Sequence, residues 1–407
     1  MMRRSLSVLA AAGLLATAVA APAAAQDSKV ITIPDGEDIK VGAMFVLSGA
    51  NAVLGEDMVY GIEAAVEDRG GELLGHEIKL VVQDSLCTPE GGAQAAQVLA
   101  SDPDMVGLIG PACSGATDGA AQIVTEAGLT HISGSATAPE LTFPDRDTRF
   151  DGFLRTAFTD AIQGQVIASY VANDLGLTKI ATIHDGSIYS EGLTRVVADE
   201  FAKLGGEVTL ATAINDGQTD MNAVLTNVAE SEPELLYIPV FTDEGGFLVD
   251  QSADIAGLED VILFGSDGLF SLDFVEASGD AVEGMYLASP NFGLFAETYA
   301  DMLETYLDIS GLDSPLQSFH AQVYDAINIL FAAIEQVAVE NDDGSLSIDL
   351  AELRSAIYGT TDFPGVTGTL SCTESGDCGA QVIAIYQVGP ETIEDEVWPP
   401  AVVFPTE

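Results

Sequence analysis

The chain has 407 residues, enough for two or three compact domains, and 47% of them are hydrophobic, which argues against intrinsic disorder. Only 13 lysines and arginines stand against 64 aspartates and glutamates, so the formal net charge is −51. A charge of this sign repels phosphate backbones and excludes nucleic-acid binding. We interpret the excess of acid as a heavily solvated surface.

The first 25 residues have the anatomy of a secretory signal peptide. A short basic region precedes an apolar stretch over 6–21, and small residues over 23–25 precede a cleavage point between Ala25 and Gln26. An uncleaved membrane anchor is the alternative, but the stretch is alanine-rich and lacks the flanking basic residues of a stop-transfer segment. We therefore expect a mature protein that begins near Gln26 and resides in the periplasm.

Along the rest of the chain, short apolar segments rich in β-branched residues alternate with amphipathic segments. This alternation predicts parallel sheets with helices on both faces. The first run predicts strands over 39–48, 76–85, 104–111 and 129–133, and helices over 58–71, 88–101 and 114–128.

A second run follows a less regular stretch over 143–156. It predicts strands over 178–185, 207–214, 234–240 and 261–267, and helices over 161–176, 190–206, 221–232 and 244–257. Two such runs indicate two doubly wound α/β lobes.

The region after Pro290 is poor in strands. It predicts helices over 295–309, 320–339 and 350–359, and strands over 367–370 and 381–386. We expect this tail to complete the first two sheets and not to build a third.

The four cysteines of an exported chain are expected to form disulfides. Cys372 and Cys378 bracket a turn-rich segment, whereas Cys87 and Cys113 each follow a predicted strand. Three pairings are possible. Pairing Cys87 with Cys113 and Cys372 with Cys378 joins cysteines that lie in similar sequence surroundings. A zinc site is the alternative, but no zinc-ligand spacing occurs and the histidines are scattered, so we predict no metal.

The usual sequence motifs of phosphate-binding enzymes and serine hydrolases are missing. Neither G-x-x-x-x-G-K-[ST], nor G-x-G-x-x-G opening a helix, nor G-x-S-x-G occurs, so we predict no cofactor. Ser114 follows Cys113 on a strand-to-helix turn that could host a nucleophile, but no neighbouring base is identifiable.

Small and hydroxyl-bearing residues follow two neighbouring predicted strands. One strand runs into Ser114 and a helix, and the next ends in the segment 133–137. Backbone N–H groups at a helix N-terminus bind anions, and open α/β sheets bind ligands at the carboxyl edge of their strands. Helix capping explains any one of these residues equally well, but two adjacent loops of this kind favour a carboxylate site.

Four segments resemble, in the same order, the periplasmic binding proteins for leucine, isoleucine and valine that serve bacterial ABC importers. They are "DSLCTPEGGAQAA" (84–96), "GPACSGAT" (110–117), "SATAPELT" (135–142) and "HDGSIYSEGL" (184–193). The resemblance runs from about Ile39 to Pro290. It implies a type I periplasmic binding protein fold, in which two lobes joined by three crossings close on a ligand.

The resemblance places the crossings near Thr156, Pro290 and Val366, and it implies that Cys87 and Cys113 are the family's disulfide pair. The implied lobes consist of 26–156 with 290–366 (lobe 1) and 157–289 with 367–407 (lobe 2).

Within lobe 1, the resemblance matches Ser114, Ser135, Ala136 and Thr137 to the positions that hold an amino acid's carboxylate and ammonium. Leu54 stands where the family has an aromatic residue over the ligand side chain.

Within lobe 2, Tyr189 matches an aromatic residue, Phe241 replaces a tyrosine, and Asp267 replaces the glutamate that meets the ammonium. Packing of Tyr189 and capping by Asp267 are the ordinary alternatives.

Three functions follow as hypotheses. The first is an importer's solute-binding protein, expected to be a monomer, that captures a branched-chain or other aliphatic amino acid and delivers it to a membrane permease without catalysis. The second keeps the fold but binds an amide, an aromatic acid or another small carboxylate, as a transporter subunit or sensor. The third is an exported serine hydrolase that uses Ser114 or Ser135.

Overall fold

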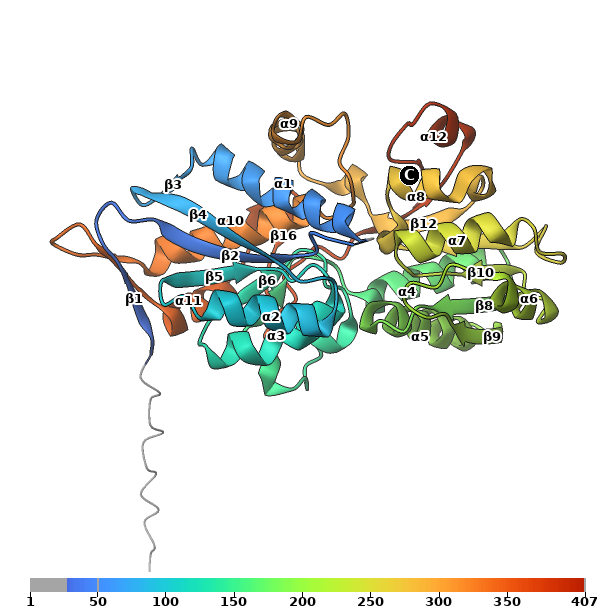
Figure 1. Cartoon of the computed structure of the whole chain (residues 1–407), viewed down its shortest axis with the longest axis horizontal. Helices are drawn as coiled ribbons and strands as arrows, with labels where there is room; N and C mark the ends of the chain where they lie inside the picture. Colours follow the sequence, from blue (N-terminus) through green and yellow to red (C-terminus); the bar gives the residue numbers. More distant parts are fainter. Residues whose placement is uncertain (1–27, 50, 406–407) are drawn as a thin grey trace, which may run out of the picture.

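Two sheets of mostly parallel strands form two lobes that lie side by side (Figure 1). This computed structural model describes residues 28–49 and 51–405, so the predicted signal peptide and its cleavage point lie outside the described residues. Among the described residues, no helix combines the length and the hydropathy needed to cross a bilayer.

The sheet of the first lobe has the strand order β3-β4-β2-β5-β6-β7, and every neighbouring pair except β3 and β4 is parallel. Helices cover both faces of this sheet, so almost every residue of its central strands is buried. Its strands are β2 (Ile39–Phe45), β3 (Glu72–Leu73), β4 (His76–Asp84), β5 (Met105–Ile109), β6 (His131–Ser133) and β7 (Phe153–Arg155).

Two pairs of helices enclose this sheet: α1 (Ala52–Asp68) with α10 (His320–Val337) on one face, and α2 (Pro89–Ala100) with α3 (Ser114–Glu126) on the other (Figure 1). Helix α2 begins at Pro89 because the Thr88 side chain accepts a hydrogen bond from the Gly91 N–H and the fixed φ of proline suits a first turn. The close approach of α2 to α3 requires glycine at Gly92, where a Cβ would lie 2.0 Å from the Ala116 carbonyl oxygen. Helices α9 (Tyr299–Ser310) and α11 (Leu350–Tyr358) pack on α1 and α10 respectively.

The sheet of the second lobe has the order β18-β17-β12-β11-β10-β8-β9. Strands β8 to β12 are parallel, and four of them come from the second run, whereas β12 was not predicted. From the tail, β17 pairs antiparallel with β12 at one edge, and β18 pairs antiparallel with β17. The strands are β8 (Lys179–His184), β9 (Glu207–Ala213), β10 (Leu235–Tyr237), β11 (Ile262–Gly265), β12 (Tyr286–Pro290), β17 (Ile383–Gln387) and β18 (Ala401–Phe404). The covering helices are α4 (Asp160–Ser169) and α5 (Ile188–Lys203) on one face, and α6 (Asn222–Glu230), α7 (Thr242–Ser252) and α8 (Leu272–Ser278) on the other.

Both sheets place the first strand of the lobe between the second and the third. In the first lobe β2 lies between β4 and β5, and in the second β8 lies between β9 and β10. A crevice forms at the carboxyl ends of the strands at such a switch point, which is where open α/β sheets bind ligands. The predicted pair of doubly wound lobes is therefore confirmed.

The tail differs from the sequence prediction. Strands β13 (Val339–Glu340) and β14 (Leu346–Asp349) form a small antiparallel sheet with β1 (Val30–Ile33) from the other end of the chain, and β15 (Phe363–Gly365) forms a hairpin with β16 (Gly368–Leu370). The expectation that the tail only completes the two large sheets is thus wrong in part, because the partner of β14 lies more than 300 residues away in sequence. Only β17 and β18 join a large sheet, and the short helix α12 (Pro390–Glu394) lies between them in sequence.

Several helix limits also differ, among them the end of α7, which lies at Ser252 and not at 257. Helix α1 begins at Ala52, six residues earlier than predicted, whereas α9 begins at Tyr299 after a separate turn over Phe292–Leu294. Helix α4 begins at Asp160, one residue before the predicted start, and continues as a π-helical turn over Tyr170–Asp174.

All four cysteines form disulfides. Cys87 pairs with Cys113 and Cys372 with Cys378, so each disulfide joins cysteines in similar sequence surroundings. The described residues contain no cluster of three histidine, cysteine or acidic side chains arranged to hold a metal ion. The division of the chain into lobes at 156, 289 and 366 remains a prediction.

Candidate ligand site between the lobes

A cavity of about 20 Å³ lies between the lobes, where their carboxyl edges meet. This volume suffices for about one water molecule, so the lobes are closed on one another and an amino acid needs them to separate. Six of the eight predicted site residues line the cavity: Leu54, Ser114, Ser135, Tyr189, Phe241 and Asp267. The other two, Ala136 and Thr137, follow Ser135 in the chain, are fully buried and do not line the cavity.

The first lobe presents neutral donors at the start of α3. The first N–H groups of this helix have no acceptor within the helix, so they are available to an anion. The Ser114 hydroxyl accepts a hydrogen bond from the Ala138 N–H at 3.2 Å, and the Ser135 hydroxyl donates to the Ala112 carbonyl at 2.5 Å. These contacts fix two loops side by side, as the two strand ends predict.

The Cys87–Cys113 disulfide anchors the start of α3. Cys113 is the residue directly before the helix and lines the cavity, and its partner precedes α2. The disulfide therefore fixes the helix terminus that lines the cavity.

The second lobe presents a carboxylate. Asp267 follows β11, is 3% exposed, and accepts hydrogen bonds from Gln163 Nε2 at 2.7 Å and the Tyr189 hydroxyl at 3.3 Å. Burial raises the pKa of Asp267 to about 6. Within the described residues no lysine, arginine or histidine forms an ion pair with it. A buried carboxyl in these surroundings either takes up a proton or pairs with a cationic group that enters the cavity.

Aromatic side chains flank this carboxylate. The rings of Tyr189 and Phe241 pack with their centroids 5.3 Å apart. Burial and the charge of Asp267 raise the pKa of Tyr189, so its hydroxyl stays protonated and acts as a donor. The structure thus brings the three second-lobe residues of the prediction into direct contact.

A second carboxylate, Asp160, was missed by sequence reasoning. It is the first residue of α4 and fully buried, and its N–H donates to the Thr137 carbonyl at 3.0 Å. Burial and the nearby charge of Asp267 raise its pKa well above the usual range. The nearby Thr137 hydroxyl lowers the pKa of Asp160 in part. Neither carboxylate oxygen of Asp160 accepts a well-formed hydrogen bond among the described residues.

The signal for this second carboxylate is local. Asp160 and Gln163 lie three residues apart on one face of the helix, directly after β7, and the Gln163 amide reaches Asp267. An acid in the first turn of a helix is ordinarily read as favourable for the helix alone, so the pair does not stand out.

Phe319 also lines the cavity without having been predicted. It lies just before α10, its N–H donates to Asp57 Oδ2 at 3.2 Å, and its ring packs near Phe158 with centroids 6.0 Å apart. Together with Leu54 and Phe241 it gives the cavity an apolar wall. No local sequence pattern marks this position.

The serine hydroxyls make contacts unlike those of a hydrolase. Ser114 and Ser135 hydrogen-bond to backbone groups, and within the described residues no hydrogen bond joins either of them to a histidine.

The sequence model of the periplasmic binding protein family matches residues 38–392. The chain belongs to this family. A Leu/Ile/Val-binding protein homolog of Brucella abortus is 29% identical over 343 residues, which cover 84% of this chain and 87% of the relative. The Leu/Ile/Val-binding protein of Escherichia coli is 30% identical over 257 residues, which cover 62% of this chain and 68% of the relative.

Solved structures agree with this family membership. A branched-chain amino acid transporter substrate-binding protein of Streptococcus pneumoniae in complex with isoleucine is 25% identical, with a TM-score of 0.75 over 87% of this chain and 97% of that one. A type 1 periplasmic binding protein of Bordetella pertussis has the same fold, with a TM-score of 0.76 and coverage of 87% and 98%. The resemblance and the type I fold drawn from the sequence are confirmed. Family membership indicates an extracytoplasmic solute-binding protein.

Proposed function

We propose that this protein is the solute-binding subunit of an ABC importer, which captures a branched-chain or other aliphatic amino acid between its lobes and delivers it to a membrane permease. The observation that carries this proposal is the buried carboxylate of Asp267, which forms no ion pair within the described residues and lines the same cavity as Ser114 at the start of α3. One side of the cavity suits an ammonium and the other a carboxylate.

The ammonium would be held by Asp267 with the Tyr189 hydroxyl beside it, and the buried carboxyl of Asp160, whose raised pKa favours its neutral form, lies near Asp267. A buried ammonium requires such compensation, because desolvation of an unpaired charge costs several kcal/mol. The carboxylate would be held by the N–H groups of α3 together with Ser114 and Ser135, and the loop that carries Ser135 continues into the buried Thr137.

The apolar wall formed by Leu54, Phe241 and Phe319 suits an aliphatic ligand side chain. The names of the relatives point the same way, since they are Leu/Ile/Val-binding proteins, and the similar solved structure holds isoleucine. Asp267 is one methylene shorter than the glutamate implied at this position. The ammonium must therefore approach closer, or a water must bridge the two groups.

A thermal-shift screen of the twenty amino acids tests this function. A ligand present at 100 times its dissociation constant adds about 2.7 kcal/mol to the free energy of unfolding. We expect leucine, isoleucine or valine to raise the melting temperature most, and mass spectrometry of ligand carried through native purification to find the same compound. If amides or aromatic acids stabilise the protein and no amino acid does, the proposed ligand class is wrong and the sensor or small-carboxylate hypothesis replaces it.

The start of the mature chain and the oligomeric state are tested separately. We propose that the mature chain begins near Gln26, resides in the periplasm and is a monomer that docks on a membrane permease. N-terminal sequencing of the exported protein and light scattering check the first and third points. A start at Met1, or a stable dimer, would contradict them.

A further inference from the structure

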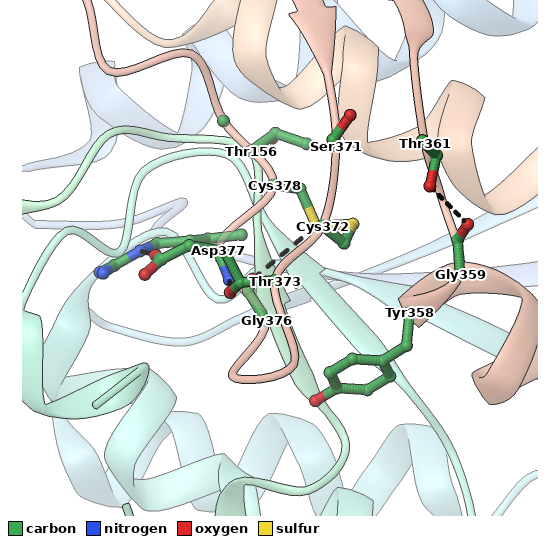
Figure 2. The surroundings of a disulfide bond; sticks show 12 residues. Thr156, Tyr358, Gly359, Thr361, Ser371, Cys372, Thr373, Gly376, Asp377 and Cys378 are labelled. Carbon is green, nitrogen blue, oxygen red and sulfur yellow. Dashed lines mark hydrogen bonds and ion pairs between the residues drawn. A yellow bond between two sulfur atoms is a disulfide. The ribbon is translucent and has the colours of Figure 1, made fainter. Parts of the chain in front are cut away.

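The Cys372–Cys378 disulfide closes a short loop that lies against β7 of the first lobe (Figure 2). Inside the loop, the Thr373 N–H donates to the Asp377 carbonyl at 2.8 Å, and the Asp377 N–H donates to the Thr373 hydroxyl at 3.1 Å. Gly376 completes the turn at a φ of +89°, in the left-handed region that favours glycine. The disulfide and these hydrogen bonds therefore fix the position of the Asp377 side chain.

Asp377 is the anionic partner of a fully buried guanidinium. Arg155, the last residue of β7, is 0% exposed, and its Nε donates to Asp377 Oδ1 at 2.6 Å. The backbones are joined as well, since the Arg155 N–H donates to the Gly376 carbonyl and the Cys378 N–H to the Arg155 carbonyl, both at 2.9 Å. A buried charge needs such a partner, so the loop is what keeps Arg155 in place.

The same guanidinium holds the loop that follows Ser135. Arg155 Nη1 donates to the carbonyls of Ala136 at 3.1 Å and Ala138 at 2.9 Å, which flank Thr137 on either side. The Ala138 N–H in turn donates to the Ser114 hydroxyl at the start of α3. A continuous set of contacts thus runs from the disulfide loop to the part of the cavity proposed to bind the ligand's carboxylate.

We propose that Asp377, together with the disulfide that holds it, positions the ligand-binding segment 135–138 through Arg155. Asp377 does not line the cavity, so it acts on the ligand only through the segment that Arg155 holds. The inference rests on the proposed function for its ligand, but the order it predicts in the segment 135–138 exists with or without a ligand.

The test compares two substitutions in the same loop. Asp377→Asn removes the carboxylate that pairs with Arg155, whereas Glu374→Gln removes an exposed carboxylate three residues away that makes no ion pair within the described residues. We expect Asp377→Asn to weaken leucine binding about tenfold, which corresponds to the net contribution of one hydrogen bond. Glu374→Gln should leave the affinity within about twofold of that of the unsubstituted protein. Isothermal titration measures both.

Hydrogen exchange in the ligand-free protein provides a readout that does not depend on binding. Amides of the segment 133–142 should exchange faster in Asp377→Asn than in Glu374→Gln, while amides of the central strand β5 exchange alike in both. If Asp377→Asn does not fold, the double variant Cys372→Ser/Cys378→Ser, which keeps the ion pair but frees the loop, is measured in its place. It should show the same faster exchange and weaker binding.

The outcomes separate the two proposals. If the unsubstituted protein binds no amino acid, the proposed function fails, and the exchange rates alone decide the inference. If the unsubstituted protein binds leucine and the variants bind it equally well, with unchanged exchange over 133–142, Asp377 has no positioning role and the inference is overturned.

Discussion

The two lobes contribute chemically different halves to one cavity. The first lobe offers N–H groups and hydroxyls, which are neutral and numerous, whereas the second offers a buried carboxylate flanked by two aromatic rings. Several donors share the neutral half, so removing one leaves the others in place. The half of the cavity that the second lobe forms depends on a single acidic residue in its lining, Asp267, whereas Asp160 is fully buried and does not line the cavity.

This difference has an energetic reason. A carboxylate held by several backbone N–H groups and the terminus of a helix needs no single charged partner. An ammonium in a water-excluded cavity is compensated by few groups, and truncating one member of such a pair leaves the other charge buried and unpaired. We therefore expect ligand binding to be far more sensitive to substitutions in the second lobe than in the first.

The largest effect is expected for Asp267→Asn. Loss of one member of a buried charge pair costs ~2 to 5 kcal/mol, which is about thirtyfold to several-thousandfold in affinity for leucine. Because burial raises the pKa of Asp267, its ionised form is unfavourable in the ligand-free fold, so the variant should melt no lower than the unsubstituted protein. Titration calorimetry and thermal melting check both points. Asp273→Asn, an exposed position on α8, is the control, and an affinity loss of equal size there would remove the special role of Asp267.

Ser114→Ala tests the neutral half. The N–H groups of α3 and the Ser135 hydroxyl remain, so we expect a loss of ~1 to 2 kcal/mol, about five- to thirtyfold in affinity. The same titration measures it. A loss greater than that of Asp267→Asn would reverse the comparison between the lobes and favour a simple carboxylate as the ligand.

Lower pH should weaken binding through Asp267. Its pKa of about 6 in the ligand-free protein means that the carboxylate is protonated at pH 5, whereas an ammonium favours the ionised form. Affinity for leucine should therefore fall about tenfold between pH 7.5 and pH 5. The stability of the ligand-free protein responds in the opposite direction. Since the folded-state pKa lies above the unfolded value, this group's contribution to stability rises as the pH falls through 6.

Calorimetry in buffers of different ionisation enthalpy checks the proton coupling. Near pH 6 about half a proton should be released for each ligand bound. Binding without proton release between pH 5 and pH 7 would show that no cationic group of the ligand meets Asp267.

Closure is expected to be the smallest measured change. Each lobe carries only half of the polar groups that a zwitterion needs, and the closed cavity holds about one water molecule, so the ligand must bind between separated lobes. The radius of gyration from solution scattering should fall when saturating leucine is added. An identical profile with and without ligand, from a free protein that is not already closed, would contradict a hinged architecture.

Much of the fold was predictable because its signals are local. The alternating strands and helices of both lobes are visible in short windows, and the polar residues after β5 and β6 mark one half of the site. Strand β14 was not predicted, since its partner β1 lies at the other end of the chain. The limits of α1 were also misjudged, because the segment 52–57 mixes small, polar and apolar residues and lacks a clear helical period.

The site was predictable to a lesser degree. Ser114 and Ser135 were marked by the two strand ends as well as by the resemblance, whereas Tyr189, Phe241 and Asp267 came from the resemblance alone. The structure brings all five around one cavity. Asp160 and Phe319 were missed because each has an ordinary local explanation, an acid at a helix start and an apolar residue before a helix. Only the folded arrangement shows that Asp160 is fully buried beside Asp267.

Calorimetric titration with leucine and two analogues that each lack one charged group tests the central claim most directly. 4-Methylpentanoate keeps the carboxylate without the ammonium, and 3-methylbutylamine keeps the ammonium without the carboxylate. Because the lobes provide complementary halves of a site for a zwitterion, leucine should bind and both analogues should bind at least about a hundredfold more weakly. If 4-methylpentanoate binds as tightly as leucine, the carboxylate of Asp267 does not receive an ammonium and the account of the site is wrong.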